Sequence, residues 1–566
     1  MDYLNKLLKT LILLALMLPT FAQESEDEEE GLEVVVTTAT KTEKDILDTA
    51  QAVTALTGSQ LVQLGLNNIK DLNNMIPGLY VQNTDTNAPI ITLRGIRTEN
   101  VTELGDPAVG IHVDGVYVAR PQAANALMFD LERTELTRGP QGTLYGRNSV
   151  VGTLNIVTAK PNFDIQGGSL NLEGGQLNQA GLRAHYNLPI NEKLALRFAY
   201  MEQSKDSFLD GYWDGSQLDW RRLPSNITDQ FQTITSPDQR SYLSDYAWYL
   251  GCSTQPGNGC GQGEFSDPFT KVKADPADFY TAIQDSAWRV SATYVIDDNA
   301  DINLQYENYE DNGKGWTNVL SCELMKTRQG AMAKDGPANT CTDLLGSENR
   351  FQAYANTPGF NKMNMDSFRA IYKRQLNETT NLTVNYGYQE LEQSSQFEID
   401  SGVNYQYGMA FNINRLLTES NVLDAYLTGA DDKWAWVGGV FTSTEDNDML
   451  ANFTAELNGH DYFVQPNREL NHYAVYGQAT YALRDDLFFT FGGRFSYDEK
   501  SDVGGRNINC NSGNGCYPQI YGTGGNPFDA INQLAPDYWI QMGQMVDGVD
   551  CVAPMIGCGV VVTNND

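Results

Sequence analysis

Long segments in which apolar and polar residues alternate constrain the fold of this chain more than any other feature. In one clear example, Leu487, Phe489 and Phe491 share one face, and Thr490 and Arg494 lie on the opposite face. A strand of about nine to eleven residues with this pattern can cross a bilayer at a tilt, with its apolar face toward lipid. We therefore expect about eleven antiparallel membrane strands, near residues 165–174, 180–189, 193–206, 287–297, 300–310, 366–376, 380–390, 421–429, 433–442, 470–482 and 486–498.

Short and long connections alternate between these predicted strands. The short turns lie at 189–193, 297–300, 376–380, 429–433 and 483–486, and the long connections at 207–286, 311–365, 391–420, 443–469 and from 499 onward. An up-and-down barrel of the outer membrane has this arrangement, because its periplasmic turns are short and its outer loops are long. A soluble sandwich also has alternating strands, but it does not sort its connections by length. An odd number of strands cannot close a meander, so we expect a barrel that is cut off by an incomplete coding sequence.

Composition excludes several other classes of protein. The chain has 38 Lys and Arg against 72 Asp and Glu, a formal net charge of −34, which argues against nucleic-acid binding. Low mean hydropathy excludes only helical membrane spans, since half of each barrel strand faces water. Motifs of a serine nucleophile, a zinc protease or a phosphate loop are missing, so we predict no enzyme, cofactor or metal site. We expect His112 and His185 on surfaces of the domain that precedes the strands or of the barrel lumen.

The first 44 residues have the composition of an export and docking segment. Lys6 and Lys9 precede an apolar run at 11–18, and this order predicts a signal peptide over residues 1–22. Six acidic residues between Glu24 and Glu30 then predict a disordered leash, within a segment that spans 23–44. The mature protein is therefore expected outside the cytoplasm.

The eight cysteines agree with export. All lie in the predicted long loops, none forms a CxxC motif, and histidine is scarce nearby, so disulfides explain them better than zinc or redox chemistry. We predict disulfides within near-neighbour couples, although other pairings of the last four stay open. The couples are Cys252 with Cys260, Cys322 with Cys341, Cys510 with Cys516 and Cys551 with Cys558.

Residues 45–162 have the pattern of a small α/β domain, and residues 163–566 that of the partial barrel with its long outer loops. Apolar residues at helical spacing, which end before Pro77-Gly78, predict a helix; they are Leu61, Leu64, Ile69, Leu72 and Ile76. Short strands are predicted at 79–82, 90–94, 109–113, 116–118 and 154–158. Asp114-Gly115, between two of them, predicts a hairpin turn.

Three motifs of this domain resemble a known family. They are ITLRGI at 91–96, VDGVY at 113–117 and ELTRGPQGTLYGRNSVVGTLNIVT at 135–158. Their order and spacing resemble the plug of TonB-dependent outer-membrane receptors over about residues 33–161. The resemblance implies a transmembrane antiparallel β-barrel of about 22 strands, of which about half is present, with an N-terminal α/β plug domain in its lumen. Val151 departs from the family pattern, which has glycine there.

The resemblance also implies roles for individual residues. Glu33, Val34, Val35, Val36 and Thr37 resemble the TonB box, which adds a strand to TonB, and their β-branched side chains suit that mode. The alternative is an ordinary first strand of the plug.

Charged residues and glycines of the plug carry further implications. Arg94, Arg138 and Arg147 are implied to lock the plug by pairing with barrel carboxylates, for which Glu307 and Glu390 are candidates. Tight plug turns are predicted at Gly95, Gly139, Gly142, Gly146 and Gly152.

The implied function is TonB-dependent active transport of a scarce ligand across the bacterial outer membrane, with a ferric siderophore as the default ligand. The implied partners are TonB with ExbB and ExbD, outer-membrane lipid and the small ligand. We expect a monomer that binds no nucleic acid. The alternatives are TonB-dependent uptake of a glycan, vitamin B12 or another nutrient, a passive porin or adhesin, and a non-functional fragment.

Overall fold

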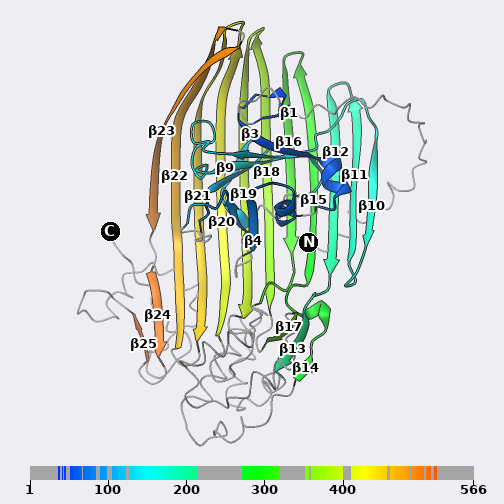
Figure 1. Ribbon diagram of the computed structural model, residues 1–566, viewed down its shortest axis with the longest axis vertical. Coiled ribbons are helices and arrows are strands. Elements are labelled where there is room, and N and C mark those ends of the chain that lie inside the picture. The colour runs from blue at the N-terminus through cyan, green and yellow to red at the C-terminus, as the bar shows by residue number, and fades with distance from the viewer. Residues whose placement is uncertain are drawn as a thin grey trace, which may run out of the picture.

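A computed structural model describes the parts of the chain that form the sheet and the plug. The described residues are 36–38, 41–42, 44–45, 51–66, 68–83, 89–98, 105–122, 128–214, 271–317, 351–355, 359–398, 409–455, 459–484, 486–502, 505–511 and 515–518. The predicted signal peptide, the leash through Val35 and six of the cysteines lie outside them. Figure 1 shows a small domain in front of one large sheet, whose long strands run nearly side by side.

Eleven long strands form an antiparallel meander, each hydrogen-bonded to the next. They are β10 (Gly167–Gly174), β11 (Ala180–Asn191), β12 (Leu194–Lys205), β15 (Ile283–Asp297), β16 (Ala300–Asp311), β18 (Phe360–Asn377), β19 (Thr380–Glu398), β20 (Met409–Ala430), β21 (Trp434–Ala455), β22 (Gly459–Arg484) and β23 (Leu487–Asp502). All eleven predicted strands are present. Several extend further into the predicted long connections than the sequence pattern indicated, because their polar ends continue the backbone ladder beyond the apolar band.

The sheet does not close into a barrel within the described residues. β10 pairs only with β11, and β23 pairs only with β22, so the two lie at opposite edges in Figure 1. Two shorter strands, β24 (Gly505–Asn511) and β25 (Gly515–Pro518), continue the sheet beside the far end of β22.

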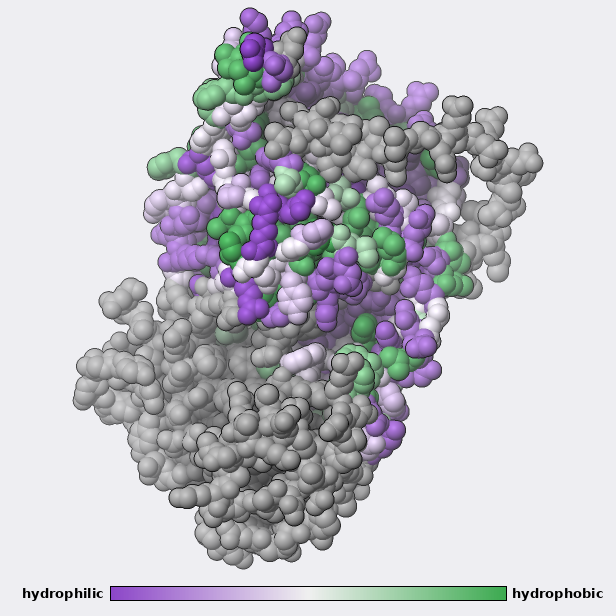
Figure 2. All heavy atoms as spheres, viewed as in Figure 1, coloured by the Kyte–Doolittle hydropathy of each residue, from purple (hydrophilic) through white to green (hydrophobic). Residues whose placement is uncertain are grey.

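The two faces of the sheet differ in chemistry, as the alternation predicts. On the outer face Val475 and Phe495 lie opposite each other with 60% and 77% of their surface exposed, which suits contact with lipid acyl chains. On the inner face Arg289, Glu307 and Arg369 are buried. Figure 2 shows the plug-bearing side, where hydrophilic residues gather at the end that carries the short turns.

The plug contains a five-stranded sheet in the order β3-β8-β9-β6-β7. These strands are β3 (Ala52–Thr57), β8 (Leu131–Arg138), β9 (Gly152–Thr158), β6 (Val109–Val113) and β7 (Val116–Val118), and a separate hairpin joins β4 (Leu79–Asn83) to β5 (Pro89–Leu93). β3 and β8 were not predicted. Asp114 and Gly115 have φ angles of 51° and 83°, so the predicted turn between β6 and β7 is present.

The predicted long helix is wrong. Two short elements take its place, α2 (Gly58–Gln63) and the 3₁₀ helix η2 (Ile69–Asn74), and each begins with a capping box. Gly65 between them has a φ angle of +65°, which no α-helix permits, and Leu64 is 52% exposed. The helical spacing survives because the buried side chains belong to two separate turns that face the same core.

Three short strands from two long connections form a separate sheet at the opposite end from the short turns. They are β13 (Asp210–Asp214), β14 (Lys271–Lys273) and β17 (Gln352–Ala355), and the 3₁₀ helix η5 (Pro276–Asp278) follows β14. Phe279 and Tyr280 are fully buried in a small apolar cluster beside it.

His112 is a buried residue of the plug, which corrects the prediction that it lies on a surface. Its exposure is 3%, and its ring centroid is 5.6 Å from that of Tyr117 and 4.8 Å from that of Tyr145. Burial, reinforced by the charges of Lys41 and Arg494, lowers the pKa of His112 to about 3. The folded protein therefore keeps this imidazole neutral at every physiological pH.

Acidification should destabilise the fold through His112. In the unfolded chain His112 binds a proton near its ordinary pKa of about 6.5, whereas in the folded chain it does so only near pH 3. The contribution of neutral His112 to stability is therefore fully present above about pH 6.5 and is lost as the pH falls toward 3. We expect a loss of about 2 kcal/mol between pH 7 and pH 5 from this group. The measurement is the free energy of unfolding of the full chain in detergent at both pH values. His112→Phe should lose less over the same interval, and an equal loss in both proteins would contradict the assignment.

Candidate functional site

The segment that follows the predicted TonB box is bound to the centre of the plug. Val36–Thr37 forms β1, which pairs antiparallel with β2 (Lys44–Asp45). Glu135 of β8 accepts hydrogen bonds from Thr37 Oγ1 (3.1 Å) and from the Thr38 backbone N–H (3.0 Å). Glu33, Val34 and Val35 lie outside the described residues. The end of the predicted box is therefore docked in this structure.

Thr38 is fixed by two further plug residues. The Tyr145 hydroxyl donates to the Thr38 carbonyl oxygen (2.9 Å), and Asn155 Nδ2 donates to Thr38 Oγ1 (3.0 Å). Glu135 is 1% exposed and also accepts from Arg133 Nε at 2.7 Å. Each of these partners belongs to the predicted motif region or its flank, so the motif provides the docking surface for the chain that precedes it.

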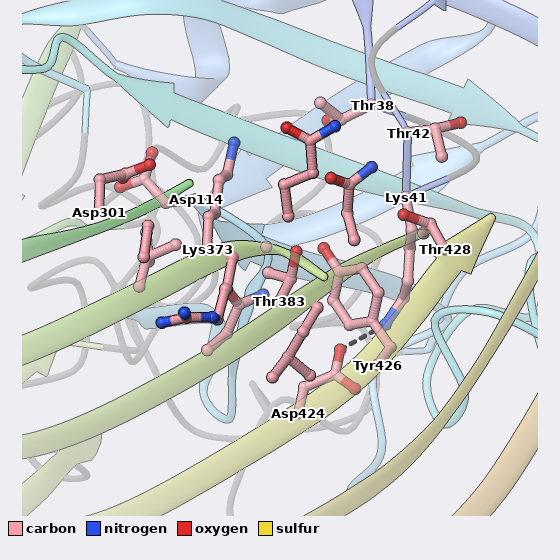
Figure 3. A pocket seen from close by; sticks show the side chains of 18 of the residues that line it. Thr38, Lys41, Thr42, Asp114, Asp301, Lys373, Thr383, Asp424, Tyr426 and Thr428 are labelled. Atoms are coloured by element: carbon pink, nitrogen blue, oxygen red, sulfur yellow. Dashed lines mark hydrogen bonds and ion pairs between the residues drawn. The ribbon is translucent and has the colours of Figure 1, made fainter. Parts of the chain in front are cut away.

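Lys41 connects the same segment to the barrel wall. Its ammonium forms an ion pair with Asp424 of β20 and donates a hydrogen bond to the Tyr476 hydroxyl of β22 (2.8 Å). Figure 3 shows the side chain reaching from the plug segment to Asp424. Burial lowers the pKa of Lys41, and the Asp424 charge opposes that shift. Sequence reasoning missed this residue, because nothing in its neighbourhood marks it as buried.

A cavity of about 720 Å³ separates this part of the plug from the sheet. Its walls come from the plug segment and from the ends of β15, β16, β18, β19 and β20, where the short turns lie. Acidic and basic side chains line it together, among them Asp114, Lys160, Asp301 and Lys373. The space is polar, and it opens beside the docked segment.

Arginines of the barrel bind the plug at Asp130. Asp130 accepts from Arg197 Nε (2.8 Å) and Nη2 (2.5 Å), and Arg289 Nη1 donates to the backbone carbonyls of Phe129 (3.2 Å) and Asp130 (3.3 Å). Glu307 lies between Arg289 (2.6 Å) and Arg369 (3.2 Å) with no exposed surface.

The same network reaches the hairpin turn of the plug. Arg369 lies 3.8 Å from the carboxylate of Asp114, which also accepts from the Thr158 backbone N–H (2.9 Å) and hydroxyl (2.8 Å). Two plug carboxylates, Asp114 and Asp130, therefore meet barrel arginines in the lumen.

The structure corrects the predicted plug lock. Arg94 is exposed in a turn with a φ angle of 52°, Arg138 is half-buried in β8, and Arg147 pairs with Asp106 of the plug itself (2.5 Å). Within the described residues, none of the three forms an ion pair with a barrel carboxylate. Glu307 is occupied by barrel arginines, and Glu390 accepts from the Tyr388 hydroxyl (3.0 Å).

Plug cations do meet barrel carboxylates, but at other positions. Arg120 pairs with Glu445 of β21, and Lys41 pairs with Asp424. Asp106, which Arg147 contacts, is bound from the other side by Lys500 of β23 (2.9 Å). Pairing depends on the depth at which each side chain enters the lumen, and a single sequence does not encode that depth locally.

The predicted turn glycines have different structural reasons. Gly95, Gly139 and Gly146 have φ angles of 80°, 112° and 79°. Gly142 has no positive φ, and Gly152 belongs to β9, where a Cβ atom would lie 2.3 Å from the Thr137 carbonyl oxygen. Close strand packing, and not a turn, requires glycine at position 152.

One predicted cysteine couple falls on described backbone. Cys510 and Cys516 are opposite each other in the register of β24 and β25, which is the backbone arrangement that the predicted couple needs. The disulfide itself stays a prediction, and the other six cysteines lie outside the described residues.

Comparison with known proteins identifies the small domain. Residues 45–153 match the family described as the TonB-dependent Receptor Plug Domain. The pesticin receptor of Yersinia pestis is 31% identical over 182 residues, which are 32% of this chain and 26% of that receptor. The ferrioxamine B receptor of Salmonella typhimurium is 29% identical over 202 residues, or 33% of this chain and 27% of that receptor. The matches thus span about a quarter of the length of these curated relatives.

Solved structures show the same fold over a longer part of the chain. The ferric yersiniabactin uptake receptor of Yersinia pestis superposes with a TM-score of 0.59 at 15% identity, and covers 82% of this chain and 59% of that one. The open form of the ferric-catecholate import receptor of E. coli gives a TM-score of 0.56 at 14% identity, with coverage of 85% and 64%. Residues 45–153 thus match the plug domain of TonB-dependent receptors, and the antiparallel sheet beside this plug has the fold of the solved uptake receptors.

Proposed function

We propose that this protein takes up a ferric siderophore across the outer membrane and that TonB drives the uptake. The observation that carries the proposal is the plug match, combined with relatives that are named as receptors for pesticin, ferrioxamine B and ferripyoverdine. A vitamin B12 transporter of Vibrio vulnificus is more distant, at 24% identity over 183 residues, so a siderophore is the better choice of ligand. TonB acts together with ExbB and ExbD in this proposal, and the receptor is a monomer.

The docked segment supports a route for the pulling force. A strand of TonB that pairs with residues 33–37 pulls on Thr37 and Thr38, which are bound to Glu135 in the central part of the plug sheet. The barrel resists through Lys41 and through the arginines that hold Asp114 and Asp130. Force on the box therefore acts on β8 while the wall holds the rest of the plug.

Deletion of residues 33–37 in the source bacterium should abolish siderophore-dependent growth, because TonB then has no strand to pair with. The measurement is growth under iron limitation together with uptake of radioactive iron-loaded siderophore. Deletion of the acidic residues 24–30 is the matched control, since it shortens the leash by a similar length and keeps the box. Uptake that persists without residues 33–37 would rule out TonB coupling through this segment.

Arg197→Ala should loosen the plug from the wall. The carboxylate of Asp130, which is 9% exposed, loses both guanidinium hydrogen bonds, and the loss of one partner of a buried pair costs about 3 to 5 kcal/mol. Faster proteolysis of the plug in the detergent-solubilised chain would report the change. Arg374→Ala removes an exposed pair with Asp297, and should have little effect. Equal proteolysis of the two variants would contradict a lock at Asp130.

A further inference from the structure

The ammonium group of Lys41 lies in a cage of three tyrosines and one carboxylate. Its distances to the ring centroids are 4.6 Å for Tyr476, 4.8 Å for Tyr426 and 5.9 Å for Tyr145, within or near the range of cation–π attraction. Asp424 supplies the opposite charge, and the Tyr476 hydroxyl accepts a hydrogen bond. We call Tyr145, Tyr426, Tyr476 and Asp424 the ammonium cage.

The cage is built from parts that stay behind when Lys41 leaves. Tyr426 and Asp424 belong to β20 and Tyr476 to β22, so three of the four residues are fixed in the barrel wall. Lys41 belongs to the segment that follows the predicted box. Withdrawal of that segment therefore empties the cage without dismantling it.

An empty cage would contain a buried carboxylate without its ammonium partner. The Asp424 side chain is 3% exposed, and the Tyr476 hydroxyl donates to it at 2.8 Å. One neutral hydrogen bond does not compensate a buried negative charge. The charge of Arg494 acts on Asp424 from a longer distance, but its hydrogen bonds are to His472 and Ser496, so Arg494 does not replace the direct ammonium contact.

A replacement cation can reach this place through the adjoining cavity. Lys41, Tyr145, Asp424 and Tyr426 all line the cavity of about 720 Å³, which also borders the plug hairpin at Asp114. A ligand that passes between plug and wall would thus meet the cage on its way to the end with the short turns.

We propose that the ammonium cage is a binding site for a primary alkylammonium group, filled by Lys41 in the resting protein and by a transported ligand of that class when the segment is withdrawn. The claim that the bound group belongs to a transported ligand rests on the proposed function. The claim that the cage binds an alkylammonium group does not. Binding of either cation excludes the other, so a ligand in the cage also favours the released state of residues 36–42.

The binding test uses the full chain in detergent and n-propylammonium as the probe. Lys41→Ala removes three methylene groups and the ammonium, and n-propylammonium restores those atoms. We expect a saturable rise of the unfolding temperature of Lys41→Ala, half-complete at millimolar concentration, at constant ionic strength. Three controls accompany this measurement. Lys41→Met fills the cage with an uncharged side chain, and Asp424→Asn, added to Lys41→Ala, removes the counterion from the empty cage. n-Propanol, added to Lys41→Ala, has the carbon chain of the probe without its ammonium group. Each of these controls should show no saturable rise. The absence of a rise in Lys41→Ala, or an equal rise in Lys41→Met, would overturn the proposal.

The wild-type protein gives a second measurement that does not depend on any variant folding. The Thr38 and Lys41 backbone N–H groups are hydrogen-bonded to Glu135 and to the Thr38 carbonyl, so their hydrogen exchange reports release of the segment. We expect n-propylammonium to accelerate exchange in a peptide over residues 36–42 several-fold, and unchanged exchange would overturn the proposal. Neither measurement involves uptake. Failure here leaves siderophore transport intact, and failure of the box deletion to stop uptake would leave the cage intact.

Discussion

The need to pair every charge that enters the lumen governs how this plug sits in its barrel. Glu307, with no exposed surface, is bound by Arg289 and Arg369. Arg369 also meets the carboxylate of Asp114, and Arg289 donates to the backbone carbonyl of Asp130, whose carboxylate is bound by Arg197. An ion removed from water requires such a partner, because its desolvation otherwise exceeds any gain from packing. Each plug–barrel pair is thus a condition for the plug to occupy the lumen at all. It is also a contact that has to be broken before the plug can move.

Features of the fold that depend on neighbouring residues could be predicted from the sequence, and features that depend on residues far apart in the chain could not. Alternation in Leu487–Phe491 and the Asp114-Gly115 turn are local, and the strands and the hairpin appear where the sequence places them. The continuous helix failed because Gly65 interrupts the backbone, while the spacing of apolar residues does not register that interruption. The strands β3 and β8 escaped prediction for the opposite reason. β8 carries polar residues at buried positions, such as Glu135, whose partners lie far along the chain, and none of the residues of β3 is fully buried.

The plug–barrel contacts could not be predicted for a related reason. Arg94, Arg138 and Arg147 stand in recognisable motifs, yet the plug residues with ion pairs to the wall are others: Lys41, Asp106, Asp114, Arg120 and Asp130. Which ion reaches which depends on strand register, on the tilt of the plug and on side-chain length together. The pairs also have both polarities. Arginines of the wall bind plug carboxylates, and carboxylates of the wall bind plug cations. The family resemblance implied pairs between plug and wall, but which residues form them follows only from the three-dimensional arrangement.

The segment from Thr37 to Lys41 combines two attachments of different strength. Thr37 and Thr38 hold a plug carboxylate through neutral donors, whereas Lys41 holds a wall carboxylate through a full charge inside an aromatic cage. In the proposed mechanism, a pull on residues 33–37 would load the neutral contacts first and the ionic contact only once those have lengthened. The stronger attachment therefore lies closer to the plug body, on the side away from the pull. With this order the segment can open by stages, and the wall retains a site whose charge and shape are those of the group that has just left it.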